Sequence, residues 1–165
     1  MRVVVADTGP LHYLVLIGHV EILPRLFGGV SVPAVVRDEL DRKATPAPVR
    51  AWVAAPPAWL VVEPGPLPDE DAGLAALDDG ERAAIALAAR LRAELLLMDE
   101  RAGVAAARAR GFEVTGTLGL LDRAAQRGFV DLDAAFAALK ATTFHLRQEL
   151  LDRLLAEHRQ RGGAA

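Results

Sequence analysis

The segment Val3-Val4-Val5-Ala6, followed at once by Asp7, decides the fold class of this chain. Four apolar residues in a row predict a strand that is buried on both faces, as in a parallel sheet covered by helices. Leu95–Met98 is a second solid apolar run, and it ends in Asp99. Shorter apolar runs alternate with helical patterns along the chain, which is typical of βαβ units. We therefore predict an α/β protein whose central parallel sheet has about five strands, flanked by helices.

The remaining elements follow from hydrophobic periodicity and from the positions of proline and glycine. The predicted strands are Val3–Ala6, Val30–Val32, Leu60–Val62, Leu95–Met98 and Phe112–Thr115. The predicted helices are Pro10–Ile17, Val20–Phe27, Pro33–Arg42, Pro48–Ala55, a helix from Asp78 or Asp79 to Arg92, a helix ending at Arg110, Leu118–Arg127, Asp131–Lys140 and Leu146–Arg159. We expect Pro24 to kink or shorten the second helix, and Pro64–Asp71 to be a loop. Residues 1–160 should form a single domain, with 161–165 as a frayed tail.

Composition narrows the class of protein. The 165 residues are 52% hydrophobic and 25% charged, which predicts one folded domain rather than a disordered chain. The chain has no cysteine, so disulfides, zinc-thiolate sites and cysteine nucleophiles are excluded. No apolar run is long enough for a membrane span, and Asp7 interrupts any signal-peptide core, so we expect a cytoplasmic protein. The net charge of −3 argues against a sequence-independent nucleic-acid coat, but not against a nuclease.

Two carboxylates occupy the ends of the two most apolar predicted strands. Asp7 follows the first strand directly, and Asp99 follows the strand that ends at Met98. The carboxyl ends of parallel strands share one edge of a sheet, and ligands bind at that edge. If the two strands are neighbours, Asp7 and Asp99 should lie close together. Either residue could instead cap the helix that follows it.

Glu39 is the third candidate, and it is chosen over its neighbours by its helical face. Val36 and Leu40 form an apolar pair with i, i+4 spacing, and Glu39 shares their face because it follows Val36 by three residues. A charge on a face that packs against the core needs a partner. Asp38 and Asp41 lie off that face and should be solvated. The structural alternative for Glu39 is a charge at the rim of the core or a pair with an arginine.

Glu81 is the fourth candidate and lies in the first turn of a predicted helix. The spacing of Asp78 and Glu81 also fits a capping box, in which Asp78 caps the helix and Glu81 bonds back to it. Eighteen residues separate Glu81 from Asp99, enough for one helix and a return strand. Four acids at one sheet edge, with no lysine among them, would repel one another. Divalent metal cations, held by carboxylates and water, would relieve that repulsion.

These segments resemble the PIN-domain family of metal-dependent ribonucleases, within a compact prokaryotic subgroup of it. The resemblance is carried by Val5–Leu11, Val32–Leu40, Leu77–Ala88, Leu96–Glu100 and Gly116–Leu121. The closing segment Ala141-Thr142-Thr143-Phe144 also looks like that subgroup. The resemblance implies a three-layer PIN-like fold with a central parallel sheet. In one departure Glu81 stands where many relatives have aspartate, and in another Val104 stands where the subgroup often has arginine.

Carried over residue by residue, the resemblance implies a metal site and an RNA path. Asp7, Glu39, Glu81 and Asp99 would be the catalytic metal ligands for Mg²⁺ or Mn²⁺. Groups expected beside them are Thr8, Thr117, Asp79 and Glu100. The arginines expected to contact phosphate are Arg101, Arg108 and Arg110, for which the alternative is a solvated helix face.

The function expected from this resemblance is a metal-dependent endoribonuclease that acts on single-stranded RNA. It would be the toxin of a type II toxin–antitoxin pair, held in check by a small antitoxin protein. The leucines of the last predicted helix should cover the core or a partner in a homodimer. The alternative is a catalytically inactive PIN-like module that binds protein or RNA. Two other α/β classes are disfavoured, because Gly9 stands where the phosphatase motif needs a second aspartate and Val114–Thr117 lacks the lysine of a receiver.

Overall fold

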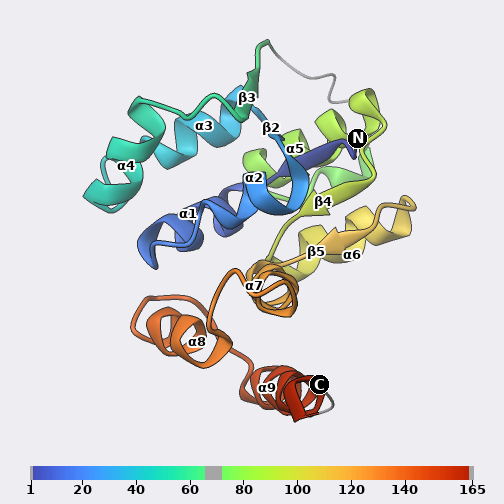
Figure 1. Cartoon of the computed structure of the whole chain (residues 1–165). Helices are drawn as coiled ribbons and strands as arrows, with labels where there is room; N and C mark the ends of the chain where they lie inside the picture. Colours follow the sequence, from blue (N-terminus) through green and yellow to red (C-terminus); the bar gives the residue numbers. More distant parts are fainter. Residues whose placement is uncertain (1, 66–71, 164–165) are drawn as a thin grey trace.

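The computed structural model describes residues 2–65 and 72–163, and Figure 1 shows their arrangement. The strands are β1 (Val4–Ala6), β2 (Val30–Pro33), β3 (Leu60–Glu63), β4 (Leu95–Leu97) and β5 (Val114–Thr115). The helices are α1 (Thr8–Leu16), α2 (Ile22–Phe27), α3 (Ala34–Leu40), α4 (Ala47–Ala54), α5 (Asp79–Leu91), α6 (Arg101–Ala109), α7 (Thr117–Gln126), α8 (Leu132–Lys140) and α9 (Gln148–Gly163), with a short 3₁₀ turn at Ala72–Leu74. The predicted α/β class is confirmed.

The described strands form one parallel sheet in the order β3-β2-β1-β4-β5. The chain first builds the sheet outward from β1 through β2 to β3, then returns to the other side of β1 to add β4 and β5. In the register of the central pair, Val5 lies opposite Leu96 and Ala6 opposite Leu97. The two strands that precede Asp7 and Asp99 are therefore neighbours, as the site prediction required.

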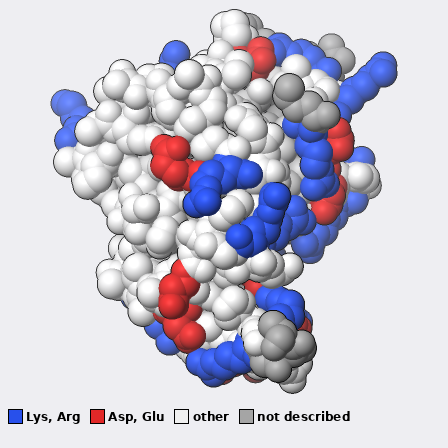
Figure 2. Space-filling view, viewed as in Figure 1, with Lys and Arg blue, Asp and Glu red and all other residues white. Residues whose placement is uncertain are grey.

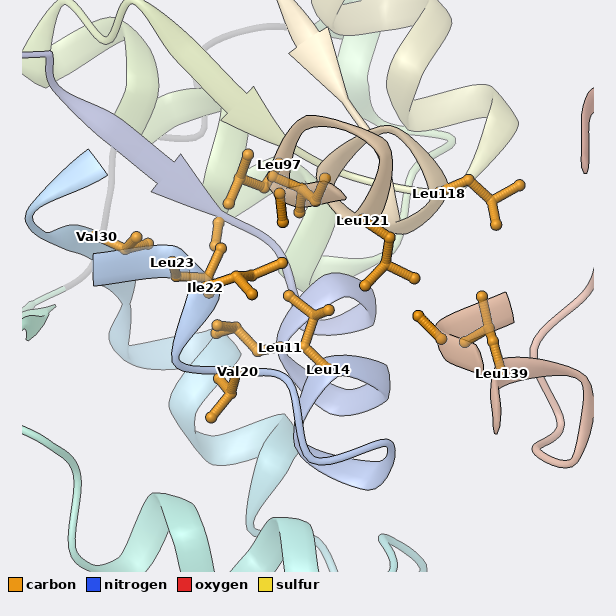
Figure 3. Close-up of a cluster of buried hydrophobic side chains, with 14 of the residues drawn as sticks. Leu11, Leu14, Val20, Ile22, Leu23, Val30, Leu97, Leu118, Leu121 and Leu139 are labelled. Carbon is orange, nitrogen blue, oxygen red and sulfur yellow. The ribbon is translucent and has the colours of Figure 1, made fainter. Parts of the chain in front are cut away.

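Helices cover both faces of the sheet, which gives the three-layer arrangement. Side chains of a strand alternate between the faces, so Val4 and Ala6 join one core while Val5 joins the other. The larger core packs the sheet against α1–α4 and α7–α9. Figure 3 shows part of it, where Leu121 of α7 lies beside Leu14 of α1. The smaller core packs the opposite face against α5 and α6.

The last helix belongs to this domain rather than projecting from it. Leu151 and Leu154 of α9 are buried in the larger core, and Leu150 and Leu155 pack against it. Of the two roles expected for these leucines, covering the core is the one observed. Asp122 of α7 accepts a hydrogen bond from Arg161 at 2.7 Å, which fixes the far end of α9.

Element boundaries differ from the predictions at a few places. The last helix begins at Gln148 instead of Leu146 and continues to Gly163, so the expected frayed tail is helical at 161–163. The helix containing Pro24 begins at Ile22 instead of Val20. Pro24 then lies in the first turn, where its missing N–H costs no hydrogen bond. Most of the predicted loop Pro64–Asp71 lies outside the described residues.

Charges of both signs lie side by side on the face shown in Figure 2. Glu113 connects the N-terminal segment to α7, because Arg2 and Arg123 both form ion pairs with it. Within residues 2–65 and 72–163, no helix is long and apolar enough to cross a membrane.

Candidate active site

The sheet order places a crevice at the carboxyl end of β1. The chain proceeds from β1 toward β2 on one side and reaches β4 on the other, so the order of strands reverses between β1 and β4. Ligands of parallel α/β sheets bind outside the strand ends at such a reversal. The N–H of Asp7 donates to the carbonyl of Leu97 at 2.9 Å, which continues the ladder one residue beyond β1. Asp7 therefore stands at the reversal point itself.

Asp7 is a buried carboxylate, and one of its two oxygens accepts no hydrogen bond. The residue is 6% exposed, and its Oδ1 has no hydrogen-bond partner. Asp7 is at the N-cap position of α1 but its side chain makes no capping bond, so the structural alternative of a helix cap is wrong. Burial, together with the nearby charges of Asp78, Glu39 and Glu81, raises the pKa of Asp7 from 3.8 to about 7, against the opposing effect of a hydrogen bond from the Thr8 backbone. A buried carboxylate oxygen without a partner is costly unless a cation lies beside it, so Asp7 is a candidate ligand for a cation.

Asp99 is held in place by the first residue of α7. Thr117 donates to it twice, from its backbone N–H to Oδ1 and from its hydroxyl to Oδ2, each at 2.7 Å. A Cβ at Gly116 would stand 2.5 Å from Oδ1, so only glycine allows this approach. Burial raises the pKa of Asp99, although the Thr117 hydrogen bonds oppose the rise. The N-cap of α6 is Glu100, so Asp99 does not cap the helix that follows it.

Glu39 faces the same region from α3. Its carboxylate accepts a hydrogen bond of 2.5 Å from the hydroxyl of Thr8 and lies 3.7 Å from the guanidinium of Arg42. The Glu39 side chain is 13% exposed, whereas that of Asp38 is 69% exposed and pairs with Arg37. The helical-face argument thus selected the residue that faces inward. The arginine pair expected as an alternative is also present, and it coexists with the contact to Thr8.

Glu81 is 5% exposed and takes part in the predicted capping box. Its backbone N–H donates to Asp78 Oδ1 at 2.8 Å, and its Oε2 accepts from the Asp78 N–H at 3.3 Å. Burial raises the pKa of Glu81 from 4.5 to about 7, with the charge of Asp78 as the next cause. Glu81 can therefore cap its helix and still be a candidate metal ligand, because only Oε2 takes part in the capping contact and Oε1 does not.

All four acids line one cleft of about 1130 Å³. Thr8, Glu100, Arg101 and Arg108 line it as well, and Thr117 reaches it through Asp99. Two predicted members lie elsewhere. Asp79 is exposed and pairs with Arg82, because it lies two residues before Glu81 and faces another side of α5. Arg110 folds back onto the carbonyl of Ala106 at the end of its own helix.

Comparison with known families identifies the chain. A family model described as PIN domain matches residues 3–160. The chain belongs to the PIN-domain family. PIN domains have a nuclease-type fold, and the family generally consists of nucleases. No curated protein and no solved structure matches the chain.

The donors of this PIN domain fit a hard divalent cation. They are carboxylate oxygens, and one of them, Asp7 Oδ1, is buried without a partner. Within the described residues, no three acidic or histidine side chains converge on a single point as they stand. Mg²⁺ binds through one or two carboxylates and keeps several waters, so its demands are met by fewer protein ligands. Thr8 and Thr117 hold Glu39 and Asp99 at the edge of the same cleft.

Sequence reasoning missed three contributors to the cleft. Asp78 was assigned only a capping role, yet it lines the cleft and raises the pKa of both Asp7 and Glu81. Arg42 follows Glu39 by one helical turn, a spacing that was visible in the sequence. The segment Thr143–Arg147 lies far from the four acids in sequence, and no local pattern connects it to them.

Gly80 sets how closely α3 approaches α5, and this gives a testable prediction. A Cβ at Gly80 would meet the Glu39 carboxylate, with Oε1 and Cδ at 2.8 Å. Gly80→Ala should displace Glu39 and lower the rate of RNA cleavage proposed below, by about tenfold or more, as for groups that orient ligands. The melting temperature should change little, because alanine gains about 1 kcal/mol of helix propensity against the steric cost. Gly162→Ala, with open space around its Cβ, is the matched control. Parent-like cleavage by Gly80→Ala would contradict this account of Glu39.

Proposed function

We propose that this PIN-domain protein is a metal-dependent endoribonuclease that hydrolyses phosphodiester bonds of single-stranded RNA. The observation that carries the proposal is the meeting of Asp7, Glu39, Glu81 and Asp99, from four separate elements, on one cleft at the reversal of strand order. The unpartnered Oδ1 of Asp7 and its raised pKa support a cation at this point. Mg²⁺ or Mn²⁺ is the cofactor proposed.

In such a site, some residues of the chain would hold the metal and others would orient those ligands. Bound Mg²⁺ or Mn²⁺ supplies a lowered pKa for an attacking water and charge stabilisation for the leaving oxygen. Asp7, Glu39, Glu81 and Asp99 would hold the metal, some of them directly and the others through its waters. Thr8 and Thr117 fix the orientation of two of these carboxylates through their hydroxyls. No nucleophilic side chain is needed, which agrees with a chain that has no cysteine.

The direct test is cleavage of an unstructured RNA by the purified chain. We expect internal cuts with Mg²⁺ or Mn²⁺ and none with EDTA. Equal cleavage in EDTA would overturn the proposal, because a carboxylate site has no other electrophile. RNA binding without cleavage at any metal concentration would instead favour an inactive PIN-like binding module.

The biological role proposed is that of the toxin in a type II toxin–antitoxin pair. Under this proposal the protein acts in the cytoplasm, as a homodimer, with a small antitoxin protein as its partner. Expression of the parent chain should then arrest growth, and co-expression of the product of a neighbouring small reading frame should restore it. Arrest that is unchanged in Asp7→Asn would argue against a toxic nuclease activity. Size-exclusion chromatography with light scattering tests the dimer.

The raised pKa values predict how the stability of the metal-free protein depends on pH. Asp7 and Glu81 have folded-state pKa values of about 7, against 3.8 and 4.5 in the absence of these effects. The folded state therefore binds more protons than the unfolded state between about pH 4 and 7. The stabilisation is complete below about pH 4 and is lost as pH rises through 7. In EDTA the melting temperature should fall over this window, and it should fall less in Asp7→Asn. Identical pH profiles for parent and variant would contradict the assignment.

Metal should reverse that loss near neutral pH. At a free metal concentration about 100 times the Kd, binding to the folded state alone adds about 2.7 kcal/mol. For a chain of this length the melting temperature should then rise by about 5–10 °C. The rise should be smaller in Asp99→Asn, which lacks one ligand. Melting curves of parent and variant, in EDTA and in excess Mn²⁺, measure the difference. Absence of any shift in the parent would count against a carboxylate metal site.

A further inference from the structure

The segment between α8 and α9 reaches the candidate active site, although it lies more than forty residues beyond Asp99 in the chain. Its residues Thr143 to His145, together with Arg147, line the cleft. It is fastened to α1 by Tyr13, whose hydroxyl lies 3.1 Å from the hydroxyl of Thr143 and whose ring meets that of Phe144 edge to face at 4.9 Å. The same helix α1 begins at Thr8, the partner of Glu39. The segment is therefore held in a fixed position beside the carboxylates.

Three arginines of the cleft have no anionic partner in the described part of the chain. Arg101, Arg108 and Arg147 are exposed and line the cleft, and none of them makes an ion pair or a side-chain hydrogen bond among residues 2–65 and 72–163. The arginines of α9 that lie outside the cleft behave differently. Arg153, Arg159 and Arg161 pair with Glu157, Asp133 and Asp122, respectively. The cleft thus holds three guanidinium groups without an anionic partner, although acids are abundant there.

The unpaired arginines approach the site from opposite faces of the sheet. Arg101 and Arg108 belong to α6, which packs on the smaller core with α5. The segment before α9 packs on the larger core through Phe144, Leu146 and Leu150, on the other face. The carboxylates stand at the sheet edge between these two layers. A polyanion that crosses this edge would meet positive charge on both sides of the acids.

We propose that Arg147 binds a backbone phosphate and that its segment and α6 together bracket a single strand of RNA across the carboxylates. The inference rests on the proposed ribonuclease function and adds to it the path of the substrate. At about 1130 Å³ the cleft exceeds the range typical of small-molecule pockets and is open to a polymer segment. Grooves for single strands combine basic side chains that track the backbone with aromatic ones, and here Tyr13 and Phe144 line the same wall. A single strand can bring a phosphate to a buried carboxylate such as Asp7, whereas paired strands are recognised by their outer shape.

The experiment measures binding in EDTA, so that no RNA is cleaved. The probes are a fluorescently labelled single-stranded RNA of mixed sequence and a duplex of the same sequence. Arg147→Ala should weaken binding of the single strand by about five- to tenfold and lower the slope of log K against log salt by about 0.7, the loss of one phosphate contact. Arg147→Lys should retain the slope. Arg153→Ala, in the helix α9 that follows Arg147 but outside the cleft, is the matched control and should bind like the parent. In Mg²⁺, Arg147→Ala should raise KM more than it lowers kcat.

The possible outcomes separate this inference from the function on which it rests. If the parent cleaves RNA with Mg²⁺ but Arg147→Ala keeps the parent's affinity, salt slope and KM, the path is wrong and the ribonuclease function stands. If the duplex binds as tightly as the single strand, the single-strand assignment is overturned. If the parent neither binds nor cleaves RNA, the proposed function itself fails. Arg147 is exposed and outside the core, so loss of folding is not expected to obscure the result.

Discussion

Asp7→Asn should abolish Mg²⁺-dependent RNA cleavage while leaving the PIN domain folded. The substitution keeps the shape of the side chain and removes the charge that a metal would bind. Loss of a ligand should cost more than the 10- to 100-fold typical of groups that only orient ligands. At pH 8 the melting temperature in EDTA should hold or rise, because burial makes the ionised form of Asp7 unfavourable. Cleavage assays and melting curves on the same preparations check both parts.

Two comparisons sharpen this result. Asp41→Asn changes an exposed acid at the end of α3 and should leave cleavage and stability as in the parent. Asp99→Asn should abolish cleavage as well, but with some loss of stability, because it disturbs the paired hydrogen bonds from Thr117. Cleavage at the parent rate by either site variant would show that the site assignment is wrong.

Glu39→Gln should be far more damaging to cleavage than Asp38→Asn, although the two residues are adjacent. The Glu39 carboxylate accepts from Thr8 and faces the cleft, whereas Asp38 lies on the outer face of α3 with Arg37. We expect a loss of about 100-fold or more for the first variant, as for a ligand, and less than twofold for the second. Initial rates measured side by side, with Mg²⁺ in excess, provide the comparison.

The melting temperatures of Glu39→Gln and Asp38→Asn show whether a loss of activity reflects a loss of folding. Glu39→Gln still accepts from Thr8 through its amide oxygen and loses the weak, partly exposed pair with Arg42, so its melting temperature should stay within a few degrees of the parent. Asp38→Asn loses an exposed pair worth little. Similar losses of activity in the two variants would refute the assignment of Glu39 by its helical face.

Much of the candidate site was accessible from the sequence because its signals are local. The solid run before Asp7 and the run before Asp99 identified strand ends. Periodicity within α3 distinguished Glu39 from Asp38, and the spacing of Asp78 and Glu81 identified the capping box that the structure contains. The capping roles considered for Asp7 and Asp99 were reasonable from spacing alone, and only the observed contacts rule them out.

The fold class, the burial of the strands and the inward face of α3 were determined by the sequence itself, because hydrophobic periodicity reports which side of an element leaves water. The tertiary structure decided the sheet order, and with it the meeting of Asp7 and Asp99, since nothing local states that β4 pairs with β1 rather than with β3. It also decided that Arg147 joins the carboxylates and that Arg110 does not. Such pairings depend on packing energies between distant segments, which a local pattern does not encode.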